Sequence, residues 1–259
     1  MTNQSHSTKH LLDLILAAKR RLPGGMWVLD FERPDHGELP AMRPGQFAQV
    51  RVDGTLLRRP ISICDTPTGG CLRMLVRPVG DATRRLCESE PGSVHNILLP
   101  LGNTFTLLDR GQRALLVGGG VGCAPMVALC RNLVADGVDV TVAIGGRTAC
   151  DIEGLTEFYA GAHVAVATDD GSAGHHGLVT TLPEFAREYD RIYACGPTPM
   201  MKAVARIAAD RGIDCEVSLE NMMACGLGAC LCCVEKTVKG NVCVCTEGPV
   251  FNISQLTWL

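Results

Sequence analysis

The chain lacks the features that mark membrane proteins, nucleic-acid-binding proteins and disordered chains. Its formal net charge is only −3 and it contains no basic run, so nothing in it indicates a nucleic-acid partner. The apolar segment at residues 11–18 is too short to span a bilayer, contains Asp13 and lacks a convincing signal-peptide cleavage site. We therefore expect no membrane span, and a short amphipathic helix or a poorly ordered leader at these residues.

Internal repeats and low-complexity tracts are also missing, and the composition is that of a globular protein. The 259 residues are 46% hydrophobic and 20% charged, enough for two domains and a small third. Fourteen cysteines would suggest disulfides in a small secreted protein, but this chain is larger and has no secretion signal. The cytoplasm, with most thiols reduced, is the expected compartment.

Four cysteines near the C-terminus carry the clearest chemical signal. Cys225, Cys230 and Cys233 follow the spacing C-x4-C-x2-C, and Cys245 lies further along. This is the plant-type arrangement for a [2Fe–2S] cluster held by four thiolates. Zinc is the alternative, but its sites usually present two C-x2-C knuckles, and no histidine is present in this segment.

Two further cysteines, Cys232 and Cys243, lie beside these four. Adjacent side chains of extended or loop backbone point apart, so Cys232 and Cys233 are not expected to reach one cluster together. We interpret Cys232 and Cys243 as small apolar residues that are not ligands.

The rest of the chain divides into two patterns. Short extended runs separated by Gly and Pro, between about residues 26 and 105, predict an antiparallel β-barrel or sandwich. From residue 113, apolar strands at 114–117, 138–144, 162–167 and 191–194 alternate with helical segments that include 125–135, 151–160 and 198–211, which predicts a parallel sheet covered on both faces. From about residue 216 there is almost no periodic structure. The expected domains are residues 1–108, 109–215 and 216–259.

Two loops of the second domain are candidate phosphate-binding elements. Gly118, Gly120 and Gly122 follow a buried strand and precede Pro125 and a helix, where backbone amides can bind phosphate. The segment departs from the usual dinucleotide fingerprint at Cys123, and such a turn can also be purely structural. A second loop at residues 195–197 ends another strand, at the edge of an open α/β sheet where ligands bind, although Cys195 could equally be a core thiol.

The first domain has two basic segments, at residues 57–62 and 77–85, which together suit a diphosphate. Adjacent arginines are otherwise often a solvated edge. Taken with the glycine loops and the cysteines, these motifs give the chain a family resemblance. It resembles the electron-transfer subunits of NAD-dependent (type 1B) dihydroorotate dehydrogenases, within the ferredoxin reductase superfamily, over about residues 26–252.

The resemblance implies an α+β multidomain protein with an antiparallel β-barrel FAD domain, an α/β parallel-sheet NAD-binding domain and a small C-terminal [2Fe–2S] domain. It implies three groups of cofactor-binding residues. The FAD site would contain Arg59, Pro60, Ile61, Ser62, Leu75, Val76, Arg77, Ala82 and Thr83, with Ala82 where the family usually has Gly. The NAD site would contain Gly118, Gly120, Gly122, Pro125, Cys195, Gly196 and Pro197. The cluster ligands would be Cys225, Cys230, Cys233 and Cys245.

The same resemblance implies electron transfer from the flavin of a dihydroorotate dehydrogenase catalytic subunit, through the cluster and FAD, to NAD⁺ in pyrimidine biosynthesis. The two subunits would form a heterotetramer, and no general acid or base of this chain would be required. The alternatives are a reductase subunit of a hydrogenase, a sulfide dehydrogenase or an electron-bifurcating complex, or more remotely a zinc-stabilised interaction module. The choice between NAD and NADP stays open.

Overall fold

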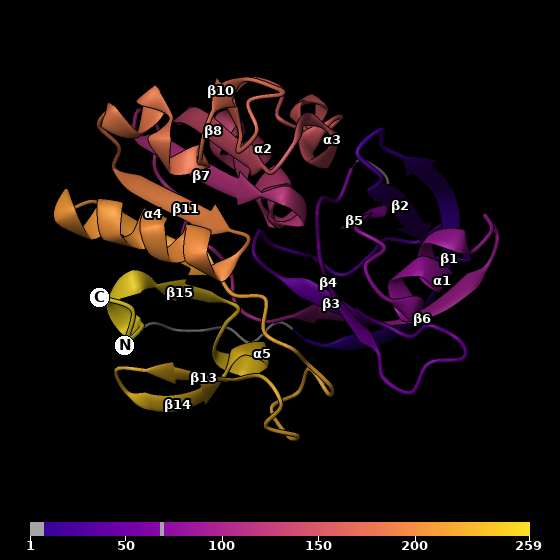
Figure 1. Ribbon diagram of the computed structural model, residues 1–259. Coiled ribbons are helices and arrows are strands. Elements are labelled where there is room, and N and C mark those ends of the chain that lie inside the picture. The colour runs from indigo at the N-terminus through magenta and orange to yellow at the C-terminus, as the bar shows by residue number, and fades with distance from the viewer. Residues whose placement is uncertain (1–7, 68–69) are drawn as a thin grey trace.

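The computed structural model describes residues 8–67 and 70–259, which form two sheets and a C-terminal hairpin around a common centre (Figure 1). The first sheet is antiparallel, with strand order β4-β3-β6-β1-β2-β5. Its elements are β1 (His10–Arg21), β2 (Trp27–Glu32), β3 (Phe47–Val50), β4 (Arg59–Ser62), β5 (Leu72–Val76), α1 (Asp81–Glu88) and β6 (Val94–Leu101). An antiparallel bridge between Asp65, just beyond β4, and Arg73 of β5 brings the two edges together, so the sheet nearly closes into a barrel.

The N-terminal prediction is wrong: residues 11–18 are neither a helix nor a leader. They belong to β1, which lies inside the sheet between β6 and β2. Leu14 and Leu16 are fully buried in the barrel core, whereas Asp13 beside them is exposed, which is the alternation of a strand. Apolar Leu11 and Ile15 on the outer face hid that alternation in the sequence.

The second sheet has the strand order β10-β9-β8-β7-β11-β12-β15 and is parallel except for β15. Its strands are β7 (Arg113–Gly119), β8 (Asp139–Gly146), β9 (His163–Thr168), β10 (His175–His176), β11 (Arg191–Cys195), β12 (Asp214–Ser218) and β15 (Val250–Asn252). The intervening helices are α2 (Ala124–Ala135), α3 (Ala149–Ile152) and α4 (Thr198–Asp210). Short 3-10 turns are η1 (Gly120–Cys123), η2 (Thr156–Phe158), η3 (Val179–Thr181), η4 (Pro183–Ala186) and η5 (Ile253–Gln255).

The central strand β7 is buried on both faces, as its continuous apolar run predicts. Leu116 packs into a core that includes Leu129 of α2, whereas Leu115 packs into one that includes Val204 of α4. The helix predicted at 151–160 is wrong in its extent, because Gly154 at φ +84° separates α3 from η2.

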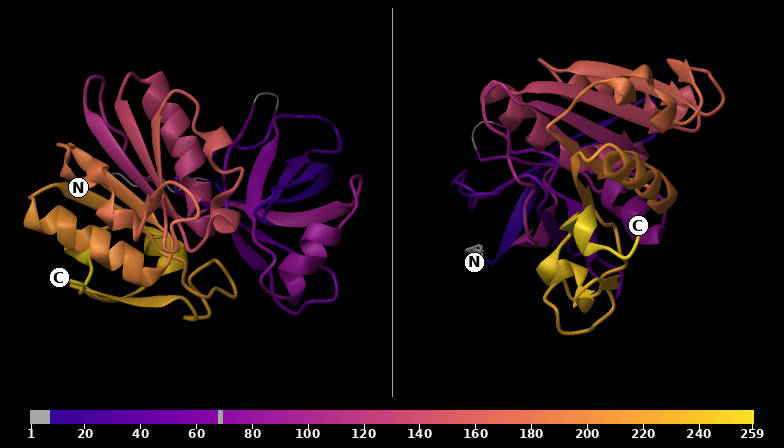
Figure 2. Two further views of the ribbon diagram at one scale, coloured as in Figure 1. Left: turned by 45° about the horizontal axis from the view of Figure 1, so that its top comes forward. Right: turned by 90° about the vertical axis from the view of Figure 1, so that its left-hand side faces the viewer.

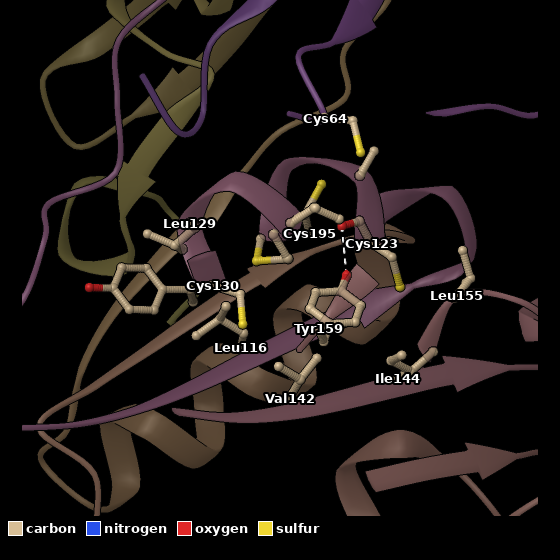
Figure 3. Close-up of a cluster of buried hydrophobic side chains, with 14 of the residues drawn as sticks. Cys64, Leu116, Cys123, Leu129, Cys130, Val142, Ile144, Leu155, Tyr159 and Cys195 are labelled. Atoms are coloured by element: carbon tan, nitrogen blue, oxygen red, sulfur yellow. Dashed lines mark hydrogen bonds between the residues drawn. The ribbon is translucent and has the colours of Figure 1, made fainter. Parts of the chain in front are cut away.

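The barrel and the parallel sheet share one continuous core, shown in part in Figure 3. Cys64, just beyond β4, lies in the same cluster as Cys123 and Cys195 of the second sheet. In this core the Tyr159 hydroxyl donates a 2.8 Å hydrogen bond to the carbonyl oxygen of Cys123, which fixes the turn at the end of β7. The barrel and the second domain are therefore packed against one another.

The C-terminal segment has more regular structure than its sequence predicts. It contains the hairpin β13 (Val234–Thr237) with β14 (Gly240–Cys243), then α5 (Val244–Glu247) and β15. Strand β15 pairs with β12 and so completes the parallel sheet, and both views in Figure 2 show this segment (yellow) lying against that sheet. Among the helices of the described ranges, none has both the length and the apolar character needed to cross a bilayer.

Candidate redox site

A groove of about 570 Å³ lies where the barrel, the parallel sheet and the C-terminal segment meet, and we call it the interdomain groove. Strand β4 and the end of β5 form its barrel wall, because these two edge strands come together where the sheet nearly closes. Eight of the nine residues predicted to bind FAD line it: Arg59, Pro60, Ile61, Ser62, Leu75, Val76, Arg77 and Thr83. Ala82 is the exception, since its methyl group is buried in the barrel core beneath α1.

The two arginines of the groove are held in different ways. Arg59 donates from its guanidinium to the carbonyl oxygens of Leu57 at 2.7 Å and Arg58 at 3.1 Å, so its charge has no carboxylate partner among the described residues. Arg77 instead forms an ion pair with Asp151 of α3, with Nη1 2.9 Å from Oδ1. Burial raises the pKa of the Asp151 carboxyl, but the hydrogen bonds from Arg77 and from the Thr148 backbone, together with the positive charges of Arg77 and Arg147, outweigh it and the pKa is lowered.

The two glycine loops of the second domain meet at the point where the strand order reverses. Cys195, the last residue of β11, is the register partner of Gly118 in β7. A Cβ atom at Gly122 would lie 2.4 Å from the carbonyl oxygen of Cys195 and 2.6 Å from the Cα of Gly196. Only glycine permits this approach, and ligands of open α/β sheets bind at such reversal points.

A smaller pocket of about 240 Å³ adjoins the interdomain groove and shares Leu219, Glu220 and Asn221 with it. Gly196 and Pro197 line this pocket, whereas Cys195 is fully buried beneath it. The Cys195 thiol donates to Oε1 of Glu220 across 3.7 Å, and burial raises the pKa of that thiol well above its ordinary value. Val121, within the first glycine loop, and Ala124, just after it, line the interdomain groove.

Three of the four predicted cluster cysteines, Cys225, Cys230 and Cys233, lie on a loop that bends back on itself, and we call residues 225–233 the cluster loop; Cys245 lies in α5. Gly226 and Gly228 have φ values of +70° and +80°, and Leu231 adopts the left-handed region at +57°, which side chains disfavour. These bends aim backbone amides at sulfur. The amide of Leu227 lies 3.3 Å from Sγ of Cys225, and that of Gly228 lies 3.2 Å from Sγ of Cys245.

The Cys225 thiol interacts with that of Cys230, and the thiols of Cys245 and Cys243 both interact with that of Cys233. Within the described chain, no three His, Cys, Asp or Glu side chains converge as on a single metal ion. Desolvation opposes ionisation of Cys225, but backbone amides and the Cys230 thiol lower its pKa to about 6. Burial and the neighbouring Cys233 raise the pKa of Cys245 to about 12.

Several residues of this region carried no recognisable motif in the sequence. Residues 220–223 follow β12, a strand that crosses the boundary expected at 215/216, and they form the C-terminal wall of the groove. Cys232 also lines the groove, so the cluster loop and the barrel wall face the same cavity. Gln49 of β3, buried beneath the cluster loop, was likewise missed, because a single glutamine inside a strand has no sequence signature.

Comparison with known proteins agrees with this geometry. Residues 220–257 match the family model described as the iron–sulfur cluster binding domain of dihydroorotate dehydrogenase B. Residues 116–206 match the oxidoreductase NAD-binding domain. The dihydroorotate dehydrogenase B (NAD(+)) electron transfer subunit of Bacillus caldolyticus is 40% identical over 225 residues, covering 83% of this chain and 86% of that protein. The corresponding subunit of Desulforamulus reducens is 39% identical over 244 residues, covering 90% and 92%.

Solved structures show the same architecture. A chain of the NADH-dependent reduced ferredoxin-NADP oxidoreductase superposes with a TM-score of 0.84 at 31% identity, covering 95% of this chain and 90% of that one. Phthalate dioxygenase reductase superposes with a TM-score of 0.67 at 17% identity, covering 91% and 94%, and so shares the fold. The order of barrel, nucleotide-binding sheet and iron–sulfur segment is therefore that of ferredoxin-reductase-like proteins.

Proposed function

The chain belongs to the family of dihydroorotate dehydrogenase B electron transfer subunits, and on that premise we propose that it links a flavin-containing catalytic subunit to NAD⁺ through FAD and a [2Fe–2S] cluster. One observation carries the proposal. The interdomain groove is bounded at once by the barrel strand β4, by the first glycine loop and by Cys232 of the cluster loop. A cofactor in this groove lies between the nucleotide site and the cluster.

The groove fits FAD in charge and shape. Arg59 supplies a cation without a carboxylate partner among the described residues, as a diphosphate requires. Phe47, Leu75 and Val121 supply apolar walls for a ring system. Thr83, in the first turn of α1, lies at a helix N-terminus, where the dipole favours negative charge.

The cluster loop fits a binuclear iron–sulfur group better than a single zinc ion. The spacing C-x4-C-x2-C with a more distant fourth cysteine matches a [2Fe–2S] site held by four thiolates. Zinc would instead need four thiolates converging on one point. The amides of Leu227 and Gly228 already point at ligand sulfur, which favours the charged thiolate form.

The chemistry is supplied by the cofactors when bound: FAD exchanges a hydride with nicotinamide and single electrons with the cluster. The chain holds these groups in order and provides the surface on which nicotinamide lies. Oxidation of dihydroorotate to orotate releases two electrons, and one NAD⁺ takes up both with a proton to give NADH. Gly118, Gly120, Gly122, Pro125 and the 195–197 loop would hold that nucleotide against the groove.

The partner would be the flavin-containing dihydroorotate dehydrogenase catalytic subunit, in a cytoplasmic heterotetramer. The surface around the cluster loop supports an interface, because large apolar side chains are exposed there. Met222 is 82% exposed, Leu231 66% and Leu227 48%. Exposed apolar side chains beside the proposed cluster are typical of a surface that a partner protein covers.

An anaerobic visible spectrum of the purified protein, with iron and zinc assays, tests the proposal. We expect flavin and cluster absorption that bleaches on addition of NADH. A colourless protein containing zinc would refute it. Addition of the catalytic subunit should then couple dihydroorotate oxidation to NAD⁺ reduction, whereas coupling to ferredoxin and NADP alone would favour the role of the bifurcating relative.

A further inference from the structure

Gln49 is a buried polar residue whose side chain has no partner. It lies in β3, is 0% exposed, and neither Nε2 nor Oε1 makes a hydrogen bond to any described residue. Its backbone lies inside the sheet, in register with Pro60 of β4 and Leu98 of β6. A buried carboxamide left unpaired is costly, and such groups in folded proteins are usually satisfied by a ligand, an ion or water.

The unpaired amide is directed at the cluster loop. A Cβ atom at Gly226 would lie 2.9 Å from Cγ of Gln49 and 3.1 Å from Nε2, so the glutamine packs against the residue that follows Cys225. This contact, together with the φ of +70°, explains why position 226 is glycine. Leu101 of β6 closes the same contact from the side, at 3.1 Å from that position.

Gln49 is also on the face of β3 that borders the interdomain groove. Side chains two residues apart on a strand share a face, and Phe47, two residues earlier, lines the interdomain groove. Phe47 in turn packs in the core that contains Cys233 and Cys245. This face of β3 therefore contributes to both proposed cofactor sites. Phe47 lines the interdomain groove, and the amide of Gln49 packs against the cluster loop.

We propose that Gln49 is a positioning residue for the iron–sulfur cluster, whose Nε2 donates a hydrogen bond to the thiolate of Cys225 when the cluster is bound. The inference rests on the proposed [2Fe–2S] site. A carboxamide nitrogen has two N–H donors, and a ligating thiolate is a charged acceptor. Donors to cluster sulfur stabilise the more negative, reduced form, and so raise the reduction potential.

The test is an EPR-monitored redox titration of the flavin-loaded protein and its Gln49→Met variant, in which the side chain keeps its length but loses the amide. We expect the ratio of reduced to oxidised cluster to fall about tenfold at a fixed solution potential, which is about 59 mV for one electron. A change of less than twofold would overturn the inference. Gln112→Met is the matched control, because Gln112 lies in the turn before β7, at the sheet edge opposite the cofactor loops, and should leave the potential unchanged.

A second variant decides the case if Gln49→Met fails to retain iron. Gln49→Asn keeps the amide but withdraws it by one methylene, so a hydrogen-bonding role predicts a lowered potential in this variant too. A cluster with the wild-type potential in Gln49→Asn would show that the residue only fills space. Iron and sulfide analysis of the wild-type protein separates this question from the proposed function, since absence of a cluster there would refute the latter first.

Discussion

A methyl group added at Gly122 should displace the proposed nucleotide-binding loops from the interdomain groove. The new Cβ atom would lie 2.4 Å from the Cys195 carbonyl oxygen, about 1 Å short of an ordinary contact of 3.4 Å. Both contacting groups are backbone, so neither can rotate away. The first glycine loop and the 195–197 loop must therefore move apart by about 1 Å.

The size of that displacement allows its effect on the rate of FAD reduction by NADH to be predicted. A misplacement of 1 Å in a site that aligns two reactants can cost on the order of 10²-fold. We expect Gly122→Ala to slow FAD reduction by NADH by about that factor, with about 1–3 kcal/mol lost in stability through overpacking. Flavin content and the cluster spectrum should persist, because the three nearest neighbours of the added atom all belong to the 195–197 loop and none to β4 or the cluster loop.

The assay is anaerobic stopped-flow reduction of the flavin at saturating and subsaturating NADH. Gly212→Ala is the control for lost stability. Gly212 follows α4 at φ +65° with nothing within 4 Å, so an alanine costs about 1–2 kcal/mol of backbone strain far from the loops. A Gly122→Ala protein that reduces its flavin within threefold of the Gly212→Ala rate would refute the reasoning.

Two further predictions concern the cluster and the domain contact. Cys225→Ser and Cys245→Ser should abolish the cluster absorption and most bound iron, whereas Cys243→Ser should keep both; loss of iron from the Cys243 variant would mean that the ligand set is misassigned. Asp151→Asn should lower the free energy of unfolding by about 1–3 kcal/mol at pH 7, because it removes the charge that pairs with Arg77. The pKa of Asp151 is lower in the folded than in the unfolded state, so its stabilising contribution is fully present above the unfolded pKa of about 3.9 and is lost as the pH falls further. The wild-type protein and Asp151→Asn should therefore have the same free energy of unfolding in urea at acid pH. A difference that stays constant with pH would contradict the prediction.

The elements that sequence predicted well are those whose signal is local. The run at residues 114–117 predicted a strand buried on both faces, and its side chains do enter two separate cores. The residues of β4 and Thr83, which the family resemblance joined into one FAD site, line one groove although they are far apart in the chain. These segments could be predicted because their motifs contain the charged and hydroxyl residues with which a diphosphate would be bound.

The elements that sequence missed depend on contacts that only folding creates. Strand β1 looked like a helix or a leader because its outer face is also apolar, and its place inside the sheet depends on pairing with β6, far along the chain. Strand β15 has three residues and, within the described ranges, β12 is its single strand partner, so its own sequence carries no signal. Ala82 was placed in the flavin site by resemblance, but a helix start has both a groove side and a core side, and its methyl group faces the core.

The pairing of β15 with β12 has a consequence for the order in which the protein is made. The parallel sheet gains its last strand from residues 250–252, which are synthesised after all four cysteines proposed as cluster ligands. During translation that sheet therefore has an open edge at β12 until the cluster loop has left the ribosome. Until residues 250–252 have emerged and paired, β12 is an unpaired edge strand, and such a strand is open to pairing with neighbouring chains.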